Sequence, residues 1–130
     1  MKKTITEVIR ERRVYFDGAF GTMLQSRGLA PGEAPEKWNL LRPEEVEKVH
    51  REYLSAGCDI LKTNTFGVNR FKYDNVKELL EAGLRCAFNA TKDFPDSYIA
   101  LDIGPLGRLL EPYGDLPFEE AVSVFSEIVK

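Results

Sequence analysis

Polar side chains and glycines follow three separate runs of strand-forming residues. These segments read DGAFGT at residues 17–22, TNTFG at 63–67 and DIGP at 102–105. Glycine turns expose backbone N–H groups to anions, and Asp17 beside them could hold an ammonium group. The N–H groups of the turn and the Asp17 carboxylate together would suit the zwitterion of an amino acid. The same turn could hold a phosphate, although its glycine spacing matches neither the Rossmann nor the Walker pattern. It could also be a tight turn with Asp17 as a local cap.

The segment at residues 63–67 follows Lys62, a charged residue at the end of a strand-like run. Asn64 belongs to a type that is depleted inside strands. A buried lysine needs a partner or a lowered pKa, which Asp17 or Asp102 could supply from neighbouring strand ends. An exposed lysine on an edge strand is the alternative. We expect Lys62 to be paired.

Helix-like and strand-like stretches alternate between these segments. Thr4 and Glu7 fit a capping box that begins a short helix. Pro43 is suited to the first position of another helix, which Gly57 ends, and Asn75 is suited to the start of a third. The predicted helices cover about 5–12, 43–56, 75–94 and 117–130. The predicted strands cover about 14–16, 58–63 and 98–102, and a long loop spans 25–42.

This alternation predicts an α/β fold with a parallel sheet. The carboxyl ends of parallel strands meet on one face, so we expect Asp17, Asn64 and Asp102 around a common mouth. The last predicted helix is still periodic at Lys130, with no glycine or proline to end it. We therefore expect residues 1–130 to be the N-terminal part of a larger domain.

Composition excludes several classes of protein. The 130 residues are 43% hydrophobic and 30% charged, with a net charge of −3, so no broad basic field favours nucleic acid or anionic lipid. No apolar run is long enough to cross a bilayer, and no secretory leader is evident. Two cysteines are too few for a disulfide framework, which favours a reducing cytoplasm. Whether Cys58 and Cys86 form a bridge stays open, and we expect no zinc site from this chain alone.

Three further residues have competing interpretations. His50 is the only histidine, and on the apolar side of its helix we expect it to be packed and hydrogen-bonded, not a ligand. Trp38 in the long loop could line a pocket or anchor the loop. Cys86 lies near the apolar face of the third predicted helix and should pack there.

Three stretches together resemble the homocysteine S-methyltransferase family. They are DGAFGTML at residues 17–24, AGCDILKTNTF at 56–66 and GPLGRLL at 104–110, followed by GDL at 114–116. They span nearly the whole chain in the family's order. Within the family, the resemblance is strongest to the homocysteine-binding region of bacterial cobalamin-dependent methionine synthases.

The resemblance implies a (β/α)8 TIM barrel, of which residues 1–130 would supply about three βα units. In that family a zinc ion held by three cysteine thiolates lowers the pKa of the homocysteine thiol. The thiolate attacks an activated methyl group. In methionine synthases the donor is methylcobalamin, which methyltetrahydrofolate regenerates, but betaine and S-methylmethionine enzymes share the same homocysteine-binding half, so the methyl donor stays open. By resemblance, Asp17 would contact the homocysteine amino group, and backbone N–H groups of Gly18, Ala19 and Phe20 would hold its carboxylate. Asn64 and Thr65 would border the pocket.

Two departures from the family pattern matter. The resemblance places the zinc cysteines on later strands, and Cys58 and Cys86 do not match them, so no metal ligand is carried over. Relatives often have a carboxylate at the position of Lys62 and a small residue at that of Asp102, which suggests a compensating Lys62–Asp102 ion pair.

An open three-strand sheet also leaves unpaired edges. We therefore expect association with the remaining barrel segments or self-association, and no methyl transfer by this chain alone.

Two rival interpretations stay open. One is a small phosphate- or nucleotide-binding α/β module, and the other is a non-catalytic assembly fragment.

Overall fold

Three segments of backbone lie parallel to one another in the structure, a computed structural model that describes all of residues 1–130. Strand β1 (Ile60–Lys62) pairs in parallel with β2 (Tyr98–Ala100). On the other side of β1, Phe16 forms an isolated parallel bridge with Ile60, and the Asp17 N–H donates to the Ile60 carbonyl at 3.0 Å. The three segments therefore run in one direction with β1 in the middle.

The strands are shorter than the sequence predicts. Residues 14–16 form a single bridge and not a strand, because the chain turns away at residue 18 after pairing only briefly with β1. The predicted strands at 58–63 and 98–102 keep only three residues each in the ladder, Ile60–Lys62 and Tyr98–Ala100. The parallel direction that the alternation predicts is confirmed.

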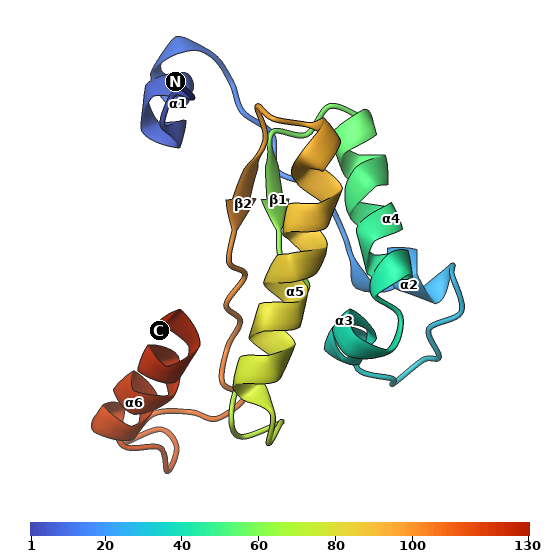
Figure 1. The fold of residues 1–130 in the computed structure, drawn as a ribbon. Helices are drawn as coiled ribbons and strands as arrows, with labels where there is room; N and C mark the ends of the chain where they lie inside the picture. Colours follow the sequence, from blue (N-terminus) through green and yellow to red (C-terminus); the bar gives the residue numbers. More distant parts are fainter.

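Two long helices cover one face of the strands. Helix α4 (Pro43–Ser55) and helix α5 (Val76–Ala90) lie side by side along β1 and β2 (Figure 1). Pro43 and Asn75 occupy the starts that the sequence predicts, and the short 3-10 helix η2 (Thr91–Asp93) follows α5. The main buried cluster lies between these helices and the segment that precedes them. It consists of Leu24, Leu29, Trp38, Val46, Val49 and Cys86.

The predicted long loop at 25–42 is wrong in part. It contains the end of helix α2 (Gly21–Gln25), the 3-10 helix η1 (Pro35–Lys37) and helix α3 (Trp38–Leu41). Elements of three to five residues are too short to produce a readable hydrophobic period. Trp38 is buried in the main cluster and its indole N–H donates to Glu33 at 3.1 Å, so Trp38 anchors this segment.

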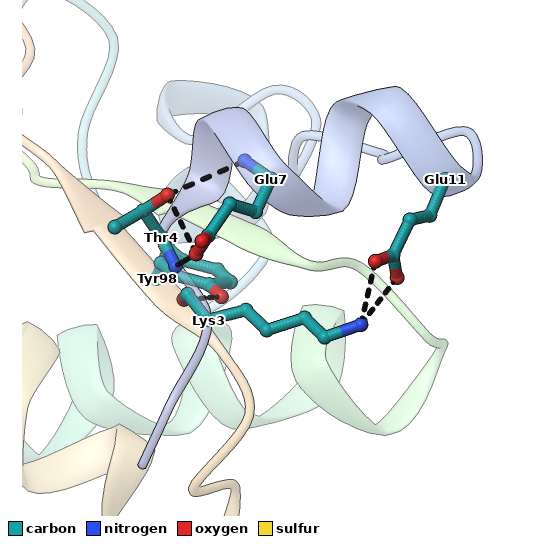
Figure 2. A network of polar contacts seen from close by, with 5 residues as sticks. All are labelled: Lys3, Thr4, Glu7, Glu11 and Tyr98. Carbon is teal, nitrogen blue, oxygen red and sulfur yellow. Dashed lines mark hydrogen bonds and ion pairs between the residues drawn. The ribbon is translucent and has the colours of Figure 1, made fainter.

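Helix α1 (Ile5–Glu11) begins with the predicted capping box. The Glu7 N–H donates to the Thr4 hydroxyl at 3.3 Å, and the Thr4 N–H donates to the Glu7 carboxylate at 2.8 Å. Figure 2 shows this box beside Tyr98, whose hydroxyl donates to the carbonyl of Lys3. Strand β2 therefore holds the start of α1 in place.

Helix α6 (Phe118–Val129) lies at the other end of the chain, below the strands in Figure 1. Its buried side chains Ala121 and Val124 form a cluster with Leu106 and Leu116. Four apolar side chains of α6 remain exposed, namely Phe118, Val122, Phe125 and Val129. No helix of the chain has the length and apolar character that a membrane span requires.

Candidate functional site

A cavity of about 320 Å³ lies where the three parallel segments end, a volume at the small end of the range for ligand sites. Four segments line it: residues 17–21, 35–36, 62–66 and Asp102. The structure thus brings Asp17, Asn64 and Asp102 to one mouth, as the parallel order requires. Gly18, Ala19, Phe20 and Thr65 line the same cavity.

Asp17 reaches across to β1 instead of capping its own turn. Its side chain is fully buried, and both carboxylate oxygens accept from the Lys62 N–H at 3.2 Å. The Lys62 ammonium lies 3.7 Å from the same carboxylate. Burial raises the pKa of Asp17, while the hydrogen bond and charge of Lys62 act in the opposite direction.

The predicted Lys62–Asp102 ion pair is wrong. Lys62 is paired, but its partner is Asp17. The bridge between Phe16 and β1 puts Asp17 directly beside Lys62. The carboxylate of Asp102 lines the cavity without a hydrogen bond or an ion pair, because only the backbone of Asp102 is engaged.

The turn after Asp17 lines the cavity and has free backbone donors. The N–H groups of Gly18, Ala19 and Phe20 donate to no group in the protein. The Tyr53 hydroxyl donates to the carbonyl of Ala19 and so fixes the turn from helix α4. Free N–H groups of a fixed turn are suited to a carboxylate or a phosphate.

Hydroxyl groups hold the backbone of Asp102 at the cavity. The Asp102 N–H donates to the Thr63 hydroxyl at 3.1 Å, and the Thr65 hydroxyl donates to the Asp102 carbonyl at 2.8 Å. The two hydroxyl oxygens lie 2.7 Å apart. Each hydroxyl has one proton, so Thr63 must donate to Thr65. The Thr65 hydroxyl is therefore used in positioning Asp102.

Asn64 is similarly occupied by the fold. Its amide nitrogen donates to the Pro35 carbonyl at 2.9 Å and to the Asn39 side chain at 3.0 Å. Asn39 donates in return to the Asn64 carbonyl at 2.7 Å. With both amide protons used, Asn64 can offer a ligand only its side-chain oxygen, and its main effect is to hold η1 against the end of β1.

Glu36 is the pocket residue that the sequence did not predict. It is buried, and its carboxylate accepts from the Gly67 N–H at 2.7 Å and from the Tyr73 hydroxyl at 3.1 Å. Burial and the Glu36 charge raise the pKa of Tyr73 to about 12. The only signal in the sequence was a carboxylate directly after Pro35 in the long loop.

The side chains that line the cavity carry more negative than positive charge. Asp17, Glu36 and Asp102 are the carboxylates, and Lys62 is the only cation. Burial and the nearby Glu36 raise the pKa of Asp102, while Lys62 acts in the opposite direction. A cationic group of a ligand is therefore electrostatically favoured in this cavity.

His50 lies behind the site. It is fully buried, and its ring centre is 4.8 Å from that of Phe20, which lines the cavity. The predicted packing is confirmed. The predicted hydrogen bond is wrong, since neither ring nitrogen has a partner in the protein. Burial lowers the pKa of His50 to about 4, so the ring is neutral at pH 7.

The chain does not fit the zinc ion that the family resemblance implies. No three His, Cys, Asp or Glu side chains are grouped so that they could hold a metal ion. Cys58 and Cys86 are free thiols that belong to different buried clusters. Burial raises the pKa of each thiol to about 11. As predicted, Cys86 packs in the core.

The sequence of the chain is similar to that of known proteins. Residues 14–130 match the sequence model of a family described as homocysteine S-methyltransferase. The chain is 29% identical over 139 residues to the methionine synthase of Mycobacterium leprae (strain TN). It is 31% identical over 121 residues to that of Mycobacterium tuberculosis (strain ATCC 25618 / H37Rv). These matches cover 95% and 81% of this chain but only 11% and 10% of the relatives.

Solved structures of the homocysteine methyltransferase MmuM from Escherichia coli share the fold. The metallated form gives a TM-score of 0.66 at 22% identity, covering 78% of this chain and 41% of that one. The oxidised form gives 0.68 at 21% identity, covering 81% and 42%. The chain therefore has the α/β fold of part of that enzyme, with parallel strands.

Proposed function

The chain belongs to the homocysteine S-methyltransferase family, and we propose that it forms the homocysteine-binding part of an enzyme that converts homocysteine to methionine. In this proposal, residues 1–130 supply about three βα units of a (β/α)8 barrel. The observation that carries it is the cavity itself, where a buried carboxylate lies beside three free backbone N–H groups.

The two charged ends of an amino acid fit these two kinds of group. The ammonium group would bind to the Asp17 carboxylate, as charge-assisted hydrogen bonds favour. The α-carboxylate would accept from the N–H groups of Gly18, Ala19 and Phe20. Asn64 and Thr65 would border the substrate while holding η1 and Asp102 in place. The side chain with its thiol would then extend away from these anchors.

The cavity's charge favours an amino acid over a phosphate. Three carboxylates line the site with one lysine, and a phosphate or nucleotide would bring further negative charge beside them. A purely structural role would leave the N–H groups of residues 18–20 to water alone. The phosphate-binding module and the assembly fragment are therefore the weaker alternatives.

The chemistry of methyl transfer would need groups outside residues 1–130. We propose that zinc, held by residues beyond this chain, activates the homocysteine thiol. We also propose that methylcobalamin supplies the methyl group. Methyltetrahydrofolate would then regenerate the methylcobalamin. This chain alone would bind and orient the amino acid but transfer no methyl group. Its two free thiols agree with a cytoplasmic location.

Calorimetric titration of the chain tests the proposal. Saturable binding of L-homocysteine is expected, with no binding of ATP. Asp17→Asn should weaken homocysteine binding by about 10- to 100-fold, because one charge-assisted contact is lost. Asp115→Asn is the matched control, since that side chain is 86% exposed and lies outside the cavity. Binding of ATP in place of homocysteine would support the phosphate module, and binding of neither would support the assembly fragment.

A further inference from the structure

Asp17 already has a counter-ion before any ligand arrives. The Lys62 ammonium lies 3.7 Å from the Asp17 carboxylate, where the proposed function places the substrate's ammonium group. Two ammonium groups on one buried carboxylate would repel each other. An incoming amino acid must therefore displace Lys62 or bind beside an unfavourable charge.

A second acceptor for Lys62 lines the same cavity. The Asp102 carboxylate makes no hydrogen bond and no ion pair, although its charge interacts with that of Lys62. The Lys62 side chain is 38% exposed, and its flexible stem can change conformation without disturbing the core. Glu36, the third carboxylate of the cavity, is held by Gly67 and Tyr73. Asp102 is therefore the carboxylate best placed to receive Lys62.

We propose that Lys62 is an exchangeable counter-ion, which pairs with Asp17 in the empty site and moves to Asp102 when the ammonium group of an amino acid takes its place. This inference rests on the proposed function. It makes Lys62 and Asp102 a pair of positioning residues that acts only when the ligand has an ammonium group. It also gives a reason for a lysine and an aspartate to occur together in this cavity.

A double-mutant cycle on homocysteine affinity tests the exchange. Asp102→Asn should weaken binding by about five- to tenfold, because the displaced Lys62 loses its receiving carboxylate. In the Lys62→Met background, Asp102→Asn should have almost no effect. Asp102→Asn should fold, since only the backbone of Asp102 is used in the fold. Lys62→Met keeps the backbone N–H that donates to Asp17, and circular dichroism checks that it folds. Lys77→Met, on a side chain that is 90% exposed, is the control and should bind as the parent does.

NMR of the carboxyl groups, which measures the pKa of Asp102, is a second test of the movement of Lys62. Homocysteine should lower the pKa of Asp102 in the parent chain and leave it unchanged in Lys62→Met. A merely structural role of Lys62 would not produce this ligand-dependent change. Equal losses from Asp102→Asn with and without Lys62, or no change in the Asp102 pKa, would overturn the exchange alone. Failure of the parent chain to bind homocysteine would overturn the exchange and the proposed function together.

Discussion

At the scale of single residues, the site depends on buried charges that have few partners. Asp17 is a carboxylate with a fully buried side chain and one lysine beside it. Its ionised form is costly in the free chain, as the raised pKa indicates. A ligand that brings its own ammonium group would offset that cost. In the proposed function, Asp17 would therefore be unfavourable in the empty site and favourable when an ammonium group is bound.

Another buried titratable group, His50, should make the stability of the chain depend on pH. Its pKa is lowered from 6.5 to about 4, so the unfolded chain binds more protons than the folded one between these values. Stability is therefore fully present above pH 6.5 and is lost as the pH falls through 4, by about 3 kcal/mol. Urea unfolding at pH 7 and at pH 4 measures this loss.

The variant His50→Phe should remove most of this pH dependence while keeping an aromatic ring against Phe20. Its free energy of unfolding should fall less than that of the parent between pH 7 and pH 4. The same fall in both proteins would show that His50 is not the group responsible.

At the scale of elements, the site depends on how closely helix α5 approaches the end of β1. A Cβ atom at Gly83 would lie 2.7 Å from Thr65 Cγ2 and 3.0 Å from Asn39 Nδ2. Both neighbours are engaged in the contacts that position Asp102 and η1. A glycine inside a helix is ordinarily unfavourable, and here it permits this approach.

Gly83→Ala should therefore destabilise the chain although alanine is the better helix former. The expected net loss is about 1–2 kcal/mol, from about 2–3 kcal/mol of overpacking less about 1 kcal/mol of helix propensity. Thermal unfolding measures it. Gly21→Ala is the control for stability, because nothing lies within 4 Å of the added methyl group. Equal melting temperatures for Gly83→Ala and the parent would contradict this account of the packing.

The sequence predicted the elements better than the contacts between them. The capping box of Thr4, the start at Pro43 and the parallel order follow from local rules, and all three are present. The short elements η1 and α3 have no readable period, so Glu36 was missed. The choice of Asp17 over Asp102 as partner of Lys62 depends on the bridge at Phe16, which is tertiary geometry and has no local signal.

At the scale of the whole molecule, apolar surface remains uncovered. The exposed stripe of Phe118, Val122, Phe125 and Val129 runs along α6, and Phe16 is exposed where the outer parallel segment ends the sheet. Exposed apolar patches and free sheet edges favour association. The chain corresponds to less than half of the length of the MmuM structures it resembles.

The isolated chain should therefore self-associate as its concentration rises. The double variant Val122→Lys and Val129→Lys should weaken this association, because it places charge on the exposed stripe. Ser123→Lys, an exposed position on the same helix outside the stripe, should change it little. Sedimentation velocity distinguishes the cases, and a stable monomer at all concentrations would contradict the prediction.

In the proposed function, the turn after Asp17 binds the carboxylate of homocysteine. We would titrate the ¹⁵N-labelled chain with L-homocysteine and follow each backbone amide by NMR. The largest shifts are expected at Gly18, Ala19 and Phe20, whose N–H groups are free in the unliganded protein. Shifts confined to other parts of the chain, or no shifts at saturating homocysteine, would contradict it.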